Sequence, residues 1–167
     1  MSEPRSLRCY QYINRPYEQV RDVLRARPLE ILARASKSAS ARTKELVANL
    51  SVSFGLVDVG VDVRTHLHGI REDEAVAGLS PVTRLDIGWE ALDSPMAFPV
   101  MRAQLSIWPL TSTETQLEIE GEYRPPLGVV GKAIDAAIGN RIAEASVHRL
   151  LDDAVEQLKR EIPEGAR

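Results

Sequence analysis

Hydrophobic and polar residues alternate through most of the middle of the chain. Between Lys44 and Tyr123 the period is two, so one set of side chains is apolar and the other is polar. This pattern is typical of antiparallel strands that bury one face and expose the other. Short turns between the runs favour a meander. The apolar sets are Leu46, Ala48, Leu50, Val52 and Phe54; Val59, Val61, Val63, Thr65 and Leu67; Leu85, Ile87, Trp89 and Ala91; Met101, Ala103, Leu105 and Ile107; and Leu117, Ile119, Gly121 and Tyr123.

Helical patterns lie on both sides of these runs. The chain begins with a predicted strand over Leu7 to Asn14, and apolar residues then recur at helical spacing over Pro16 to Ala26. Pro28 breaks this helix and starts a second, shorter one. A long helix is predicted from Leu127 to about Ile162, and Pro163 and Gly165 follow it as stop signals.

This order of elements predicts one α+β domain over residues 1–167, with a curved antiparallel sheet of six or seven strands wrapped round the long C-terminal helix. Two short helices follow the first strand. The apolar face of the sheet is broader than one helix stripe can cover. Small residues on that face, Ala48, Ala91, Ala103 and Gly121, favour a space beneath the helix. The sequence therefore predicts an apolar hollow with the last helix as its cover.

Two segments carry a resemblance to a known superfamily. "INRPYEQVRDVL", Ile13 to Leu24, is similar to its strand end, proline turn and first helix. The "RPP" sequence before "RIAEASVHRLLDDAVEQL", Arg141 to Leu158, is similar to its passage from last strand to last helix. The chain thus resembles the helix-grip (SRPBCC) superfamily of START domains, polyketide cyclases and birch-pollen allergens. Arg21 stands where that superfamily commonly has tryptophan. The resemblance implies a cavity for lipids, sterols, polyketides or quinones.

Composition narrows the class of protein. Hydrophobic residues make up 44% and charged residues 27%, and the net charge is -3, which is typical of a soluble domain and argues against a nucleic-acid binder. Cys9 is the single cysteine, which excludes an internal disulfide and a cysteine zinc site. No apolar run approaches membrane-spanning length, so we expect a cytoplasmic protein without stable membrane insertion. No cofactor is expected.

The predicted ligand-binding residues are the inward strand and helix positions. Tyr123 is the strongest polar candidate, because a buried phenol usually finds a hydrogen-bond partner. Arg141 is expected near the inward side of the last helix; Gln11 and Thr115 are weaker polar candidates. The expected lining is Leu50, Val52, Phe54, Leu67, Ile87, Trp89, Met101, Ala103, Leu105, Tyr123, Ile134, Ile138 and Arg141.

Other candidate sites have a simpler interpretation. His66 and His68 share a strand face at a spacing that suits two metal ligands, but their neighbours are polar, and an exposed face is the better account. His148 is interpreted as a surface residue of the last helix. Trp108 is expected on the polar face, where a contact with a partner protein is the alternative to simple exposure. Cys9 is assigned no role, and no metal site is predicted.

Three functions remain open at this point. The leading hypothesis is binding or transport of a small, mostly apolar ligand in the internal cavity. The second is a cyclase or aromatase that acts on a polyketide-like chain, which needs inward-facing acids or bases. The third is a protein-interaction module whose core is filled. A homodimer is compatible with all three.

Overall fold

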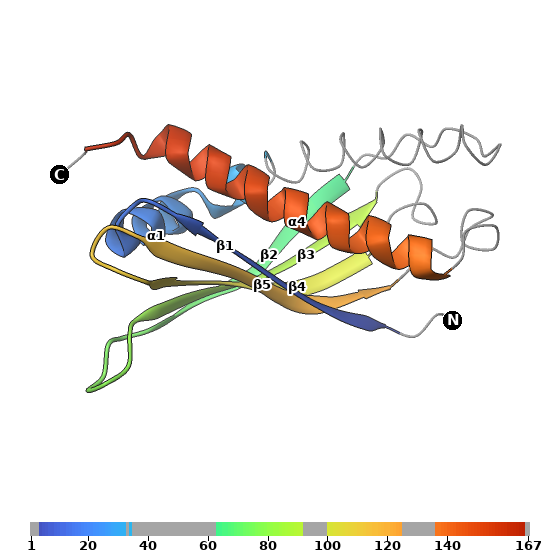
Figure 1. The fold of residues 1–167 in the computed structure, drawn as a ribbon, viewed down its shortest axis with the longest axis horizontal. Coiled ribbons are helices and arrows are strands. Elements are labelled where there is room, and N and C mark those ends of the chain that lie inside the picture. Colours follow the sequence, from blue (N-terminus) through green and yellow to red (C-terminus); the bar gives the residue numbers. More distant parts are fainter. Residues whose placement is uncertain (1–3, 33, 35–62, 92–99, 125–135, 166–167) are drawn as a thin grey trace.

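The computed structural model describes residues 4–32, 34, 63–91, 100–124 and 136–165. Within these ranges the fold is α+β: one antiparallel sheet lies beneath a long C-terminal helix, with a short helix at one end (Figure 1). The strands are β1 (Arg5–Ile13), β2 (Val63–Asp73), β3 (Val82–Ala91), β4 (Val100–Pro109) and β5 (Thr115–Arg124). The helices are α1 (Tyr17–Ala26) and α4 (Ala136–Glu161). This arrangement confirms the predicted helix-grip class.

The sheet has the order β1-β5-β4-β3-β2. Strands β2 to β5 form the predicted meander, and β1 pairs with β5 so that β1 and β2 are the outer strands of the described sheet. Five strands are described where six or seven were predicted. The predicted run from Leu46 to Phe54 lies outside the described residues, as does the first part of the run that begins at Val59.

Strand β2 extends to Asp73, beyond the predicted end of the run near His68, and it contains a β-bulge. The pairing with β3 shifts between Leu67 and Gly69, so an extra residue interrupts the alternation at His68. Beyond the bulge the strand resumes, and Ile70 pairs with Leu85. The alternating run in the sequence ends at Leu67 because the bulge shifts the following side chains out of the period of two.

The two helical predictions at the N-terminal end are confirmed. Helix α1 follows Pro16, whose missing N–H costs nothing at a helix start, and it buries Tyr17, Val20 and Leu24. Residues 28–32 are also helical, as the break at Pro28 predicted. Neither α1 nor α4, within the described ranges, offers an apolar stretch sufficient to cross a membrane.

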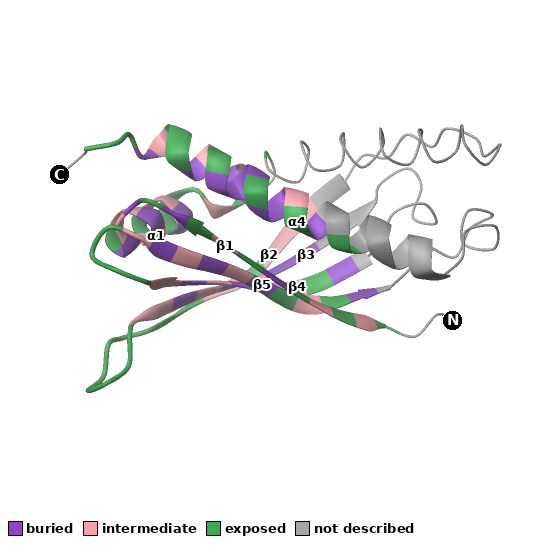
Figure 2. Ribbon diagram, in the orientation of Figure 1, coloured by how far each residue is buried: buried purple, intermediate pink, exposed green. Residues whose placement is uncertain are grey.

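Helix α4 packs its apolar stripe against the sheet. Figure 2 shows the buried residues of α4 on the side turned towards the strands. The helix contacts β1 and β5 most, and its C-terminal end reaches α1. The start predicted at Leu127 lies outside the described residues, whereas the end near Ile162 agrees with the structure. The buried stripe is Val147, Leu150, Leu151, Ala154, Val155 and Leu158.

Buried hydrogen bonds join α1 and the C-terminal end of α4 to the sheet. The hydroxyls of Tyr17 and Thr83 lie 2.7 Å apart and both residues are buried. The Arg15 guanidinium donates to the Ile162 carbonyl at 2.6 Å and to the Asn14 carbonyl at 2.7 Å. The Thr115 hydroxyl donates to the Arg15 carbonyl at 2.8 Å. These bonds fix α4 at its C-terminal end.

Candidate functional site

The inward face of β3, β4 and β5 is the candidate site, and its side chains lie in rows across the strands. One row pairs Trp89 with Met101 and Met101 with Tyr123. The next pairs Leu67 with Ile87, Ile87 with Ala103, and Ala103 with Gly121, and the following row includes Leu105. Ile87, Met101, Leu105 and Tyr123 are buried, and Leu67 and Ala103 are partly buried. Antiparallel pairing thus brings together predicted residues that are far apart in sequence.

Some predicted lining residues are not tested by this geometry. Leu50, Val52, Phe54 and Ile134 lie outside the described residues. Ile138 and Arg141 belong to the first turns of α4, and Trp89 belongs to β3. For these three the structure describes the backbone position alone.

At the centre of the inward face, strands β4 and β5 lie close together where Gly121 pairs with Ala103, and these two residues are in contact. A Cβ atom built on Gly121 would lie 2.5 Å from the Ala103 Cβ and would also meet the Arg102 carbonyl oxygen. No side chain fits there without a shift of β4 against β5. On either side of this pair the rows carry larger residues, Met101 with Tyr123 and Leu105 with Ile119. Ala103 and Gly121 therefore form a low strip across β4 and β5, where little side chain projects from the sheet. Bulky side chains border this strip on both sides.

Tyr123 is the polar group of this face. It is 2% exposed, and burial raises the pKa of its phenol above the usual value. Arg5, its cross-strand neighbour in β1, opposes the rise in the pKa, and Glu144 of α4 adds to it. The phenol therefore stays protonated at neutral pH and is a hydrogen-bond donor at the end of the sheet beneath the first half of α4.

Acids and bases are scarce on this face. The inward positions of β3, β4 and β5 carry threonine, aliphatic side chains, glycine, methionine, Trp89 and Tyr123, and no carboxylate, lysine, arginine or histidine. Gln11 and Thr115, the weaker polar candidates, have structural roles: the Gln11 amide donates to Asp152 at 2.7 Å and Thr115 bonds the Arg15 carbonyl. General acid–base chemistry would have Tyr123 as its main candidate.

Cys9 is buried at the interface of β1 with α4. It is 3% exposed, and burial raises the pKa of its thiol to about 12, with a further contribution from the charge of Asp152. A thiol with so high a pKa is protonated at neutral pH and is a poor nucleophile. This environment agrees with assigning Cys9 no catalytic role.

The outward histidines lie on a polar face, as interpreted. The His66 and His68 rings stack with their centroids 6.2 Å apart. Nearby, Asp86 accepts hydrogen bonds from Gln104 and Arg71, and these bonds, Gln104 first, hold the pKa of its carboxyl below the usual value. Within the described ranges no three His, Cys, Asp or Glu side chains gather closely enough to hold a metal ion. His148 is exposed on α4.

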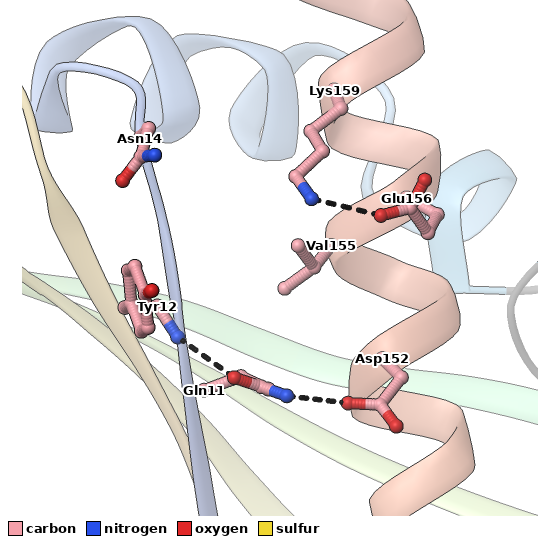
Figure 3. Close-up of a pocket in the computed structure, with 7 residues that line it drawn as sticks. All are labelled: Gln11, Tyr12, Asn14, Asp152, Val155, Glu156 and Lys159. Atoms are coloured by element: carbon pink, nitrogen blue, oxygen red, sulfur yellow. Dashed lines mark hydrogen bonds and ion pairs between the residues drawn. The ribbon is translucent and has the colours of Figure 1, made fainter.

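A hollow that the sequence did not predict lies between β1 and α4. It has a volume of about 380 Å³, and its two walls face each other in Figure 3. No sequence motif marks it, because it depends on how α4 crosses the outer strand. Its lining residues are Gln11, Tyr12, Asn14, Asp152, Val155, Glu156 and Lys159.

Comparisons with known proteins agree with the fold. No protein-family model and no curated protein matches the sequence. A conserved protein from Geobacillus kaustophilus superposes with a TM-score of 0.51 at 11% identity, over 94% of this chain and 97% of that chain. The Zhui aromatase/cyclase from Streptomyces sp. R1128 gives a TM-score of 0.44 at 14% identity, over 98% and 99% of the two chains. A norcoclaurine synthase point mutant from Thalictrum flavum gives 0.39 at 7% identity, over 98% and 99%.

Proposed function

We propose that this helix-grip protein binds one small, mostly apolar molecule between the inward face of the sheet and α4. The observation that carries the proposal is the difference in width between the two layers. Helix α4 contacts chiefly β1 and β5, whereas the apolar inward face continues across β4 to β3. A single helix does not span that width, and Ile87, Met101 and Leu105 are already buried in the chain alone, so the ligand would occupy a space among these side chains and not an open surface. Such a ligand would gain about 25 cal/mol per Å² of its own apolar surface removed from water.

The low strip at Ala103 and Gly121 supports a position for the ligand. The neighbouring pairs, Met101 with Tyr123 and Leu105 with Ile119, are larger. A flat or narrow apolar group fits such a strip better than a bulky one. Ile87, Met101 and Leu105 would provide the contact surface, together with Leu67 at the side of β2.

Tyr123 would orient the ligand. Its phenol is protonated and lies at the end of the same face, so it can donate a hydrogen bond to a ligand carbonyl or hydroxyl oxygen. Arg5 and Glu144 are the charged neighbours of the phenol, and the other inward positions of β3 to β5 carry no acid or base. This scarcity favours binding over a reaction that needs an acid and a base on the inward face.

The test is a titration of the purified chain with 11-(dansylamino)undecanoic acid, followed by fluorescence. The proposal predicts saturable binding of one probe per chain. Ala103→Leu should weaken it at least tenfold by filling the strip, whereas Ala75→Leu, at an exposed loop position, should leave it unchanged. Absence of saturable binding, or equal affinity in both variants, would reject the proposed site.

A further inference from the structure

The outer strand β1 offers an open backbone edge along the hollow that it forms with α4. Strand β1 pairs with β5 on one side, and in the described sheet no strand pairs with its other side. The Tyr12 N–H donates to the Gln11 side chain, and this direction points it to the open side of β1. In an antiparallel pair, every second residue directs its backbone groups to the same neighbour. Arg8 and Tyr10 therefore share the outward direction of Tyr12.

The Gln11 side chain makes only a weak hydrogen bond to this edge. Its Oε1 atom lies 3.4 Å from the Tyr12 nitrogen, which is longer than the usual 2.7–3.2 Å. The other end of the same amide donates to Asp152 of α4 at 2.7 Å (Figure 3). An incoming backbone carbonyl can thus replace Gln11 at the Tyr12 N–H at normal length, while the bond to Asp152 keeps Gln11 in place.

The side of the hollow that α4 forms carries charged side chains. Glu156 and Lys159 form an ion pair at 2.8 Å and offset each other, and hydrogen bonding to Lys159 lowers the pKa of the Glu156 carboxyl. Asp152 is exposed, accepts the Gln11 amide, and makes no ion pair with any residue in the described ranges. The two carboxylates and one ammonium of this wall leave one negative charge, at Asp152.

Exposed aromatic side chains lie along the same strand. Tyr10 is 68% and Tyr12 56% exposed, although both are large and partly apolar. Tyrosine is enriched in protein interfaces because it buries much area at little cost in conformational entropy. An exposed edge strand that carries two such residues is suited to strand addition.

We propose that this groove binds an extended peptide segment of another protein, which adds as a strand to β1 and places a lysine or arginine beside Asp152. Backbone hydrogen bonds to Tyr10 and Tyr12 would supply affinity. The charge of Asp152 would select a basic side chain, since charge complementarity acts chiefly on specificity. The proposal is independent of the ligand proposed for the inward face.

Fluorescence anisotropy tests it with a fluorescein-labelled heptapeptide of alternating threonine and valine with a central lysine. The lysine peptide should bind at least tenfold more tightly than the same peptide with a central glutamate. A peptide with N-methylated residues, which cannot donate to the edge, should not bind. Asp152→Asn retains an acceptor for Gln11 and should remove the advantage of lysine over methionine at the centre. Asp22→Asn, on the exposed side of α1, is the control and should preserve it.

Three results would overturn the proposal. The first is the absence of binding by the lysine peptide at millimolar concentration. The second is equal affinity for the lysine and glutamate peptides. The third is a concentration-dependent dimer in sedimentation that the Tyr12→Lys variant disrupts, because the edge would then belong to a contact between two copies of this chain.

Discussion

Gly121 lies so close to Ala103 that the contact limits what either residue can be. Gly121→Ala should destabilise the protein by about 1–3 kcal/mol, the usual cost of overpacking. Urea unfolding measures the difference. Gly69→Ala is the matched control, because nothing lies within 4 Å of a Cβ built there. Equal stabilities of the two variants would contradict the close approach of β4 and β5.

The Tyr17 and Thr83 hydroxyls are a second residue-level feature, because both are buried and lie 2.7 Å apart. Tyr17→Phe leaves the Thr83 hydroxyl without this partner, and the expected loss is about 1–3 kcal/mol in the free energy of unfolding. Thr83→Val alone should cost a similar amount. The double variant should lose less than the sum of the two, and strict additivity would argue against the hydrogen bond.

Cys9 predicts a pH dependence of stability. Burial raises the pKa of its thiol from the ordinary value of about 9 to about 12 in the folded state, so the folded state holds a proton that the unfolded state releases. The contribution to stability is complete below about pH 9 and decreases as the pH rises towards 12. Tyr123 has the same sign, because burial also raises its pKa.

The Cys9→Ala variant isolates the thiol from Tyr123. Its free energy of unfolding should fall less between pH 8 and about pH 10.5 than that of the parent chain. Below pH 8 the difference between the two chains should be constant. A difference that does not change over the alkaline range would show that the thiol is not buried as described.

At the scale of elements, α4 is held to the sheet by its C-terminal end. Arg15→Met removes the bonds to the Ile162 and Asn14 carbonyls and should cost about 1–3 kcal/mol, because a buried acceptor loses its charged donor. Hydrogen exchange should rise in the last turns of α4. Arg8→Met is the control, since its ion pair with Glu118 is exposed and such pairs contribute little. Similar exchange in both variants would contradict this role for Arg15.

Helices and strands could be predicted from the sequence where a regular spacing of apolar residues marks them. Alternation located β3, β4 and β5, and helical spacing with prolines located α1 and the end of α4. The end of β2 was predicted too early because its bulge breaks the period at His68. A sequence does not state register, so the contact of Gly121 with Ala103 required the structure.

The residues of the candidate site likewise divide into those that the sequence could identify and those that required the structure. Tyr123 was identified because it occupies an apolar position of the alternating run and because a buried phenol usually needs a hydrogen-bond partner. Arg15 and Asp152 were missed because their partners, Ile162 and Gln11, are more than a hundred residues away in the chain. One signal existed for Arg15: it lies between a strand and a helix-starting proline, where a side chain can reach both.

For the whole molecule, the decisive feature is that α4 contacts chiefly β1 and β5, whereas the buried apolar face continues across β4 to β3. The C-terminal half of α4 is buried against β1 and β5, and the apolar face extends beyond it (Figures 1 and 2). A ligand on that face would be shielded by α4 and oriented by Tyr123. Tyr123→Phe should therefore weaken binding of a ligand with a carbonyl oxygen by about tenfold, the value of one hydrogen bond, and leave a pure hydrocarbon unaffected. Competition of each compound against the dansyl probe measures this difference.

Methyl NMR spectroscopy can show whether a ligand occupies the inward face beneath α4. With 13C-labelled Ile, Leu, Met and Ala methyl groups, addition of 11-(dansylamino)undecanoic acid should shift the signals of Ile87, Met101, Ala103 and Leu105. The exposed Leu79, at the β2–β3 turn, should not respond. Unchanged signals on the inward face at saturating probe, or shifts at Leu79 alone, would contradict the account.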